Sequence, residues 1–197
     1  MGIGELFSTY GENYLQALLQ TWSMTAVSFA CAMAIALAIT VFRVSPIKPL
    51  RITGDLYVQI FRNIPGVSLL VIITYALPYL GLTLDYKTCA MVTITMVVAA
   101  FASENLMTGI NTIGVGQIEA ARSIGLSFGQ ILRHVVIPQA VRSVILPMTN
   151  LLIGTLLTTA LASQVPLKPP ELTGMVSYVN SRSVGGISAF FISAIGY

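Results

Sequence analysis

The chain has 197 residues, of which 55% are hydrophobic and only 9% are charged, and its mean hydropathy is +0.84. A soluble domain of this size would carry about a quarter charged residues. Composition therefore excludes a water-soluble globule, a disordered chain, a collagen-like repeat, a nucleic-acid-binding module and a disulfide-stapled secreted protein. The net charge of +3 is too small to indicate a partner by itself.

The first predicted element is a membrane-spanning helix over residues 13–42, a run of 30 residues without a charge. About 20 apolar residues suffice to cross a bilayer. The residues before this run are acidic rather than basic, and the run is longer than a signal-peptide core, so we do not expect cleavage. Ala30, Ala34 and Ala38 recur at four-residue spacing and predict a face for close packing within the chain, with dimerisation as the alternative.

Four further apolar runs follow, over residues 63–84, 88–103, 143–167 and from about 187 to the last residue. The third span reaches a full length only if it extends past Glu104 to about residue 110. The last run, eleven residues, gives about 16 Å at 1.5 Å per residue, which is shorter than a bilayer core of about 30 Å. We therefore expect an all-α, polytopic helical bundle forming one transmembrane domain over 1–197, whose fifth helix needs roughly two dozen more residues.

The basic residues predict the orientation. Seven of the ten fall in two segments, after the first span and between the third and fourth spans: Arg43, Lys48, Arg51, Arg62, Arg122, Arg133 and Arg142. Because cytoplasmic segments are enriched in lysine and arginine, both segments are expected in the cytoplasm and the N-terminus outside.

The sequence contains no recognisable motif for catalysis or for binding a nucleotide or a metal. A GxxxxGK[ST] phosphate loop is missing from the sequence, and Gly114-Val115-Gly116 lacks the third glycine of a dinucleotide fold. The single histidine, His134, falls in a cytoplasmic basic segment, where we expect a surface residue, and with Cys31 and Cys89 it makes no metal-ligand pattern. We therefore predict a protein that is not an enzyme and binds no cofactor or metal itself.

The segment before the fourth span carries the strongest pattern. Apolar residues recur at three- and four-residue steps and alternate with polar ones, which is typical of an amphipathic helix; they are Ala121, Ile124, Phe128, Ile131, Leu132 and Val135. Gly125 is expected to divide this segment into two short helices or to permit a close approach, and Pro138 to begin the next helix. Such a segment suggests a docking surface, and an interfacial helix lying on lipid is the alternative.

Glu119-Ala120-Ala121, then Gly125 after three intervening residues, and an apolar triplet ending in Pro138 together resemble the EAA loop of ABC importer permeases. The flanking Gly116-Gln117 resembles the polar amino acid branch of that family. Two weaker matches are residues 57–65 and Ala100-Phe101-Ala102-Ser103-Glu104, which are similar to that branch's second-helix start and its Ala-Tyr-x-x-Glu segment.

The resemblance implies a type I importer permease in a bacterial inner membrane that moves polar amino acids by alternating access. The EAA loop, about residues 114–138, would couple it to a separate ATPase dimer, which would hold ATP and Mg, through Gly116, Gln117, Glu119, Ala120, Ala121, Gly125 and Pro138. A second permease copy or homologue, an extracytoplasmic solute-binding protein and membrane lipid are the other implied partners, with no nucleic acid. An ATPase-independent carrier or channel is the alternative, although such carriers often show internal repeats, which this sequence lacks.

Three positions depart from the branch's pattern: Gln59 replaces a glutamate, Asn63-Ile64 replaces Gly-Thr, and Met107 replaces an arginine. Glu104 thus lacks a cation one helical turn away, so it either finds another cation, is protonated or faces water.

Polar residues inside spans are candidates for a translocation path, namely Tyr75, Glu104, Asn150 and Thr158. For the serine, threonine and glycine positions, helix packing is the favoured explanation, because these residues commonly serve helix packing in membranes. Residues 164–182 contain three prolines and are expected to form a rigid, proline-rich outer segment, too polar to span the membrane, that receives a binding protein or only connects two helices.

Overall fold

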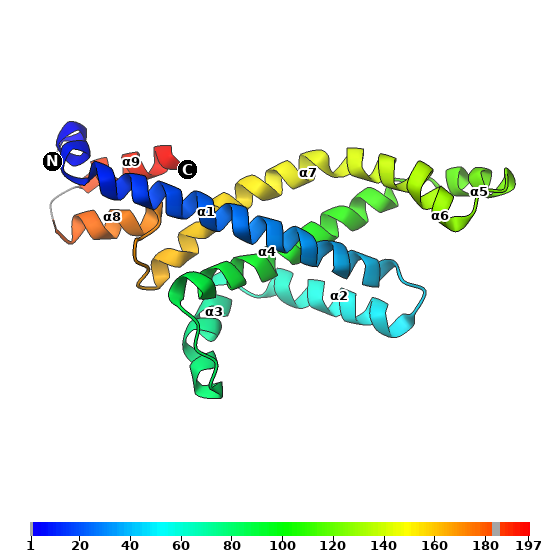
Figure 1. The fold of residues 1–197 in the computed structure, drawn as a ribbon, viewed down its shortest axis with the longest axis horizontal. Helices are drawn as coiled ribbons and strands as arrows, with labels where there is room; N and C mark the ends of the chain where they lie inside the picture. Colours follow the sequence, from blue (N-terminus) through cyan, green and yellow to red (C-terminus); the bar gives the residue numbers. More distant parts are fainter. Residues whose placement is uncertain (1, 183–185) are drawn as a thin grey trace. The chain divides into compact units, whose positions relative to one another are not determined.

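The computed structural model describes residues 2–182 and 186–197, and within these ranges the chain contains helices and no strands (Figure 1). The predicted all-α class is therefore confirmed. The helices are α1 (Ile3–Val44), α2 (Lys48–Asn63), α3 (Gly66–Val71), α4 (Tyr86–Asn111), α5 (Val115–Ser123), α6 (Phe128–Ile131), α7 (Ile137–Thr158), α8 (Leu172–Asn180) and α9 (Gly186–Gly196). Two π-helical turns, Ile72–Ala76 and Leu132–Val136, and two 3-10 segments, Leu77–Leu80 and Thr159–Gln164, extend α3 and flank α7.

Three helical stretches are long and apolar enough to cross a membrane: α1, α4 and a continuous run from Gly129 to Gln164 that contains α7. These confirm the first, third and fourth predicted spans. The second predicted span, 63–84, is different, because the apolar helix beginning at Gly66 ends at Leu80 and reaches spanning length only if it is counted together with α2. Pro65 and the proline at position 78, which cannot donate a backbone hydrogen bond, lie at its start and in its last turn.

The proline-rich segment 164–182 contains a helix that the sequence analysis did not predict. Residues 172–180 form this helix, α8. The side chain of Glu171 caps α8 by accepting hydrogen bonds from the backbone N–H groups of Thr173 and Gly174. Glutamate is not among the residues usually preferred at an N-cap, which is why the start signal was overlooked.

The chain folds as two compact units. The first is built from three separate stretches, Met1–Cys31, Ile64–Val97 and Ile153–Tyr197, and the second from two, Ala32–Asn63 and Val98–Leu152. In the first unit α8 and α9 lie side by side and pack on the start of α1 (Figure 1). Their shared core consists of Leu6, Tyr14, Ala17, Leu172, Met175, Val176, Val179, Ala189 and Ile192.

In the second unit, glycines permit close helix approach at two places. A Cβ atom at Gly54 of α2 would lie 2.7 Å from Cγ of Arg43 and 3.2 Å from the carbonyl oxygen of Ile39, both on α1. At Gly109 of α4, a Cβ atom would collide with the side chain of Val144 and lie 3.1 Å from the carbonyl oxygen of Ala140, both on α7. Small residues at such contacts let helix backbones approach each other in membranes.

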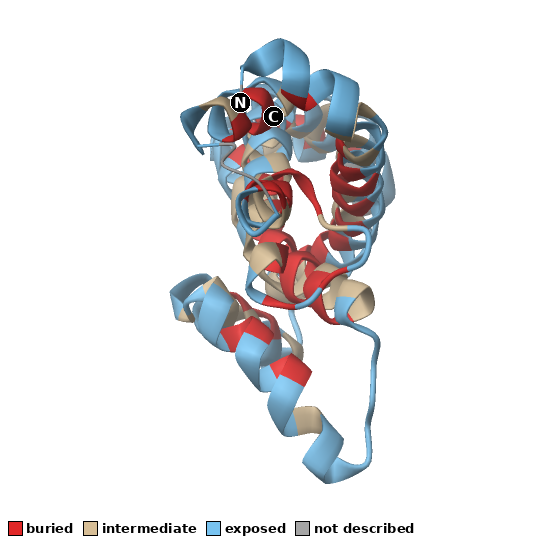
Figure 2. Ribbon diagram, turned by 90° about the vertical axis from the view of Figure 1, so that its left-hand side faces the viewer, coloured by how far each residue is buried: buried red, intermediate tan, exposed pale blue. Residues whose placement is uncertain are grey.

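The predicted packing face of the first span is wrong. Ala30, Ala34 and Ala38 are exposed, whereas Ala32 and Ala36 are fully buried. Figure 2 shows buried residues (red) as stripes on helices whose other sides are exposed (pale blue). The buried stripe of α1 also includes four hydroxyl residues: Thr21, Thr25, Ser28 and Thr40. The hydroxyls of Thr25 and Thr40 donate to carbonyls one turn earlier in α1, whereas that of Ser28 donates to the carbonyl of Met91 on α4.

Candidate functional site: the predicted coupling segment, a charged cluster and a pocket beside α8

The segment resembling an EAA loop folds as two short helices, α5 and α6, joined by a sharp turn at Gly125. This is the first of the two predictions for Gly125, that it divides the segment. Gly125 has a φ of +82°, a left-handed conformation that strongly favours glycine. The N–H of Leu126 donates to the carbonyl of Ala121 at 3.2 Å, and the N–H of Gly125 to that of Arg122 at 2.9 Å. This pair of bonds defines a Schellman motif, in which glycine occupies the left-handed position after the helix.

The second short helix has its own start signal. The N–H of Ser127 donates to the side chain of Gln130 at 2.8 Å, and the N–H of Gln130 donates to the hydroxyl of Ser127 at 3.4 Å. Such a reciprocal pair is a capping box. The prediction that Pro138 begins the next helix is wrong: α6, the π-helical turn Leu132–Val136 and α7 follow one another without a break, so Pro138 lies inside a continuous helical run, directly after the π-helical turn.

The segment 115–138, here named the coupling segment for its predicted role, exposes most of the residues predicted to contact an ATPase. Gly116, Gln117, Glu119 and Ala120 on α5 are exposed, as are Gly125 and Pro138, whereas Ala121 is buried and packs inward. Ile124, predicted on the same apolar face as Ala121, is instead 75% exposed at the turn, and His134 is exposed as predicted. The side chains of Phe128 and Leu132 lie outside the described part of the structure. The segment thus presents both charged and apolar groups at one turn.

Glu104 has two cations beside it, although neither was predicted. Its Oε2 lies 3.0 Å from Nη2 of Arg43 and 3.6 Å from Nη1 of Arg62. The first of the three alternatives for Glu104, another cation, is therefore correct. No spacing rule could have found these partners, because Arg43 ends α1 and Arg62 ends α2, and only packing in the second unit brings them to α4.

Arg43 is the centre of this charged cluster, which also contains Asp55. The Nε atom of Arg43 donates to Oδ1 of Asp55 at 2.9 Å, and its Nη1 donates to the hydroxyl of Ser103 at 3.3 Å. The hydroxyl of Thr40 bonds that of Ser103 at 3.0 Å. The arginine side chain is only 11% exposed, so the cluster fixes the end of α1 against α2 and α4.

The four residues proposed for a translocation path are divided between the two units, Glu104 and Asn150 in the second and Tyr75 and Thr158 in the first. Glu104 lines a cavity of about 350 Å³ in the second unit. Thr158 lines a different cavity of about 610 Å³ in the first unit, and its hydroxyl donates to the carbonyl of Gly154 at 2.6 Å. Tyr75 and Asn150 are exposed and line neither cavity.

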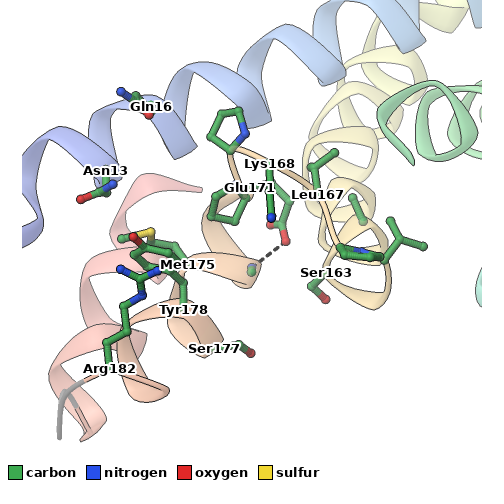
Figure 3. A pocket seen from close by; sticks show the side chains of 16 residues that line it. Asn13, Gln16, Ser163, Leu167, Lys168, Glu171, Met175, Ser177, Tyr178 and Arg182 are labelled. Carbon is green, nitrogen blue, oxygen red and sulfur yellow. Dashed lines mark hydrogen bonds between the residues drawn. The ribbon is translucent and has the colours of Figure 1, made fainter. Parts of the chain in front are cut away.

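A third cavity, of about 570 Å³, lies in the first unit beside α8 (Figure 3). Its lining includes Asn13 and Gln16 of α1, Lys168, Tyr178 of α8, and Arg182, which follows α8. The guanidinium of Arg182 stacks over the ring of Tyr178 at 4.4 Å from the centroid.

Glu171 is fully buried at this third cavity, and its hydrogen-bond donors among the described residues are uncharged. Besides its two backbone donors at 2.6 Å, it accepts a hydrogen bond from the hydroxyl of Tyr197 at 2.9 Å. Burial raises the pKa of the Glu171 carboxyl, and the hydrogen bonds from Thr173, Tyr197 and Gly174 oppose this rise.

Comparisons with known proteins are consistent with this architecture. Residues 33–195 match the family model described as the inner membrane component of binding-protein-dependent transport systems. The glutamate transport system permease protein GluC of Corynebacterium efficiens is 34% identical over 98% of this chain and 89% of its own length. The L-cystine transport system permease protein TcyB of Bacillus subtilis is 33% identical over 88% of this chain and 74% of its own length.

Solved structures share the fold. A crystal structure of an amino acid ABC transporter with histidines has a TM-score of 0.90 over 96% of this chain and 87% of that chain, at 24% identity. An inward-facing structure of the MetNI methionine ABC transporter has a TM-score of 0.74 over 93% of this chain and 87% of that chain, also at 24% identity. With apolar helices of spanning length, the chain is a multi-pass membrane protein, and it belongs to the family of inner-membrane permease components of binding-protein-dependent ABC transport systems.

Proposed function

We propose that this chain is the membrane-spanning subunit of an ATP-driven importer for polar amino acids. The relatives support this substrate class, because their names specify glutamate and cystine transport, and a further relative, GlnM of Bacillus subtilis, is a probable glutamine permease that is 33% identical over 76% of this chain and 69% of its own length. The working assembly contains a cytosolic ATPase dimer, a second permease copy or homologue, and an extracytoplasmic solute-binding protein.

The observation that carries the proposal is the structure of the coupling segment. A flexible loop could not transmit force, but α5 and α6 are held by a Schellman motif and a capping box. At the turn between them, Ile124 is 75% exposed, and Val115 at the start of α5 is 69% exposed. Apolar side chains at the end of a rigid, partly charged segment are suited to a groove on another protein.

Coupling requires that the ATPase contacts this segment differently in its two states, because only a difference in binding free energy shifts a conformational equilibrium. ATP and Mg act on the ATPase, and this chain supplies the contact surface. Glu119 contributes a charge, Ala120 and Gly116 leave room for close approach, and Gly125 sets the angle between the two short helices. Alternating access then follows from movement of the helices that the segment joins.

The proposal places the coupling segment in the cytoplasm and the N-terminus outside. Its test uses single cysteines at positions 122 and 87 in a Cys31→Ala, Cys89→Ala background, labelled by a membrane-impermeant reagent in intact cells. We expect labelling from outside at position 87 and not at position 122. Labelling of position 122 would reverse the orientation and remove the segment from the ATPase.

The decisive experiment compares Gly125→Val with Gly129→Val. A Cβ atom added at either glycine would meet nothing within 4 Å in the described part of the chain, but only Gly125 has a left-handed φ. A β-branched residue there costs about 1–2 kcal/mol of backbone strain and changes the turn. We expect Gly125→Val to lose ATPase capture in pull-down and substrate-stimulated ATP hydrolysis, while Gly129→Val retains most of both.

Glu119→Lys tests the charged part of the same surface, with Glu12→Lys, an exposed charge reversal on α1, as its control. We expect only Glu119→Lys to weaken ATPase capture, since a mismatched charge at an interface lowers affinity. Full coupling in both Gly125→Val and Glu119→Lys would refute this role. Uptake that persists without any ATPase subunit would instead identify a secondary carrier or channel.

A further inference from the structure

The side of α2 that faces away from α1 carries an apolar stripe. On the packed side, Gly54 closely approaches the carbonyl oxygen of Ile39, and Val58, one turn further on, is buried. The opposite side carries Ile52, Leu56 and Ile60, which are 48–54% exposed. Because residues four apart lie on one face of a helix, these three side chains form a continuous stripe. The described part of the chain leaves this stripe uncovered.

Two cations lie at the beginning of the stripe. Lys48 and Arg51 belong to the first turn of α2, and both are exposed. Neither takes part in an ion pair with any residue that the structure describes. The one carboxylate of α2, that of Asp55, is paired with Arg43 at 2.9 Å. The positive charges of Lys48 and Arg51 are therefore free to meet an anion from outside the chain.

The path of α2 places these cations near a membrane surface. Figure 1 shows α2 running back beside the last turns of α1, which is a candidate membrane span. Only residues 45–47 separate the two helices, so the start of α2 lies close to the end of the span. At 1.5 Å per residue, the stripe extends about 12 Å from Ile52 to Ile60. This is close to the hydrocarbon thickness of one leaflet, about 15 Å.

The order of charged and apolar groups along α2 fits a phospholipid. A phospholipid carries its phosphate at one end and its apolar chains along the rest, and α2 presents two cations followed by an apolar stripe. A protein segment seated on the stripe would also meet Lys48, and lysine is depleted in protein interfaces. The cytoplasmic leaflet is rich in anionic lipids, and each lysine or arginine near its surface strengthens the attraction about fivefold.

We propose that this face of α2 is a binding site for an anionic phospholipid of the cytoplasmic leaflet. The lipid phosphate pairs with Lys48 and Arg51, and an acyl chain lies along Ile52, Leu56 and Ile60. A zwitterionic lipid matches the stripe equally well but brings a cation of its own beside the two protein cations, so the site selects a headgroup with a net negative charge. The choice of leaflet rests on the orientation proposed above.

The test places a tryptophan on the stripe by Ile52→Trp in a Trp22→Phe background, because Trp22 is the only tryptophan of the chain. The full chain is reconstituted in phosphatidylcholine nanodiscs with increasing fractions of acyl-brominated phosphatidylglycerol or acyl-brominated phosphatidylcholine, which quench tryptophan on contact. We expect phosphatidylglycerol to quench at fractions about tenfold lower. Trp22 of the parent protein, exposed on α1, is the control and should be quenched equally by both lipids.

Two results of this experiment contradict the proposal. Equal quenching of the introduced tryptophan by the two lipids would show that the site does not select a charged headgroup. Absence of quenching by either lipid would show that a protein segment covers the stripe.

Lys48→Gln and Arg51→Gln assign the two charges, with Lys168→Gln, an exposed lysine outside α2, as the matched control. In the probe background, each of the first two should reduce the preference for phosphatidylglycerol about fivefold, and the double variant should abolish it. Lys168→Gln should keep it. A preference retained in the double variant contradicts the assignment.

Stability in detergent separates lost lipid binding from misfolding. Without added lipid, Lys48→Gln and Arg51→Gln should unfold at the temperature of the parent protein, because neither cation has an ion-pair partner in the described part of the chain. A clear loss of thermal stability in detergent would mean that the two cations serve the fold, and it would count against the site.

Failure of this site is distinguishable from failure of the proposed function, because binding in nanodiscs needs neither the ATPase nor a transported solute. If phosphatidylglycerol is not preferred but uptake still depends on the ATPase, the site is wrong and the importer stands. If phosphatidylglycerol is preferred but uptake persists without the ATPase, the site stands on a secondary carrier. Labelling of position 122 from outside would assign the lipid to the other leaflet and contradict the cytoplasmic placement.

Discussion

Two carboxylates in this molecule are stabilised by different means. Glu104, in the second unit, lies beside two arginines and remains 35% exposed. Glu171, in the first unit, is fully buried and is held by two backbone N–H groups and one phenol hydroxyl. The first arrangement depends on charge, and the second depends on the free donors of a helix start.

The difference shows how each unit tolerates an acidic residue inside an apolar protein. An ion pair needs partners from other helices, so the Glu104 cluster joins α1, α2 and α4. A capped helix start needs only nearby backbone donors and one further contact, so Glu171 stabilises α8 locally. Variants at the two sites should therefore differ in size of effect, in salt dependence and in pH dependence.

The largest effect is expected for Arg43→Met. The substitution keeps a long apolar stem but leaves Asp55 and Glu104 without their main cation, and breaking a buried pair costs about 3–5 kcal/mol. Because both carboxylates are partly exposed, about 2 kcal/mol is expected here. Thermal unfolding in detergent measures the loss, and Arg51→Met is the control. If the two variants were equally stable, the cluster would be unimportant for folding.

Glu171→Gln should cost less, about 1 kcal/mol, because the side chain keeps its volume and one acceptor oxygen. The loss arises where the new amide NH₂ group faces the donors of Thr173 or Tyr197. Protease protection of α8 reports the local effect. Glu12→Gln, an exposed change on α1, is the control, and equal protection in both variants would mean that Glu171 does not cap α8 in solution.

Raising the salt concentration should change the stability difference caused by Arg43→Met by several tenths of a kcal/mol and leave that caused by Glu171→Gln unchanged. The partly exposed ion pairs of Arg43 are screened as salt rises, whereas the buried hydrogen bonds of Glu171 are not. The stability difference between the parent protein and Arg43→Met should shrink between low and high salt, and that for Glu171→Gln should stay constant. A constant difference at both sites would show that the cluster acts through packing instead of charge.

The smallest effect concerns pH. Burial raises the pKa of Glu171 above its usual value of 4.5, so the folded protein binds this proton more tightly than the unfolded chain does. The resulting stability is fully present below pH 4.5 and is lost as pH rises through the raised pKa. The melting-temperature difference between the parent protein and Glu171→Gln should thus fall with rising pH. An increase with pH would mean that the backbone donors outweigh burial.

The sequence predicted those features that depend on neighbours along the chain. The turn at Gly125 and three of the apolar spans follow from local propensity and run length, whereas Pro138, expected to begin a helix, lies inside a continuous one. The partners of Glu104 depend on helix packing and could not be predicted. Periodicity also failed to identify the buried side of α1, because Ala30 and Ala32 are equally small and only neighbouring helices decide which is covered.

The contact at Gly109 has a mechanical consequence for the coupling segment. Gly109 is two residues from the end of α4, and Ala140 is three residues into α7, so the segment is anchored at a backbone-close crossing near both of its ends. Nine residues of α5 make a rigid arm of about 14 Å. The segment between α4 and α7 is thus closed at its base by a close helix crossing, and a side chain larger than hydrogen at Gly109 would push the two helices apart where the segment leaves them.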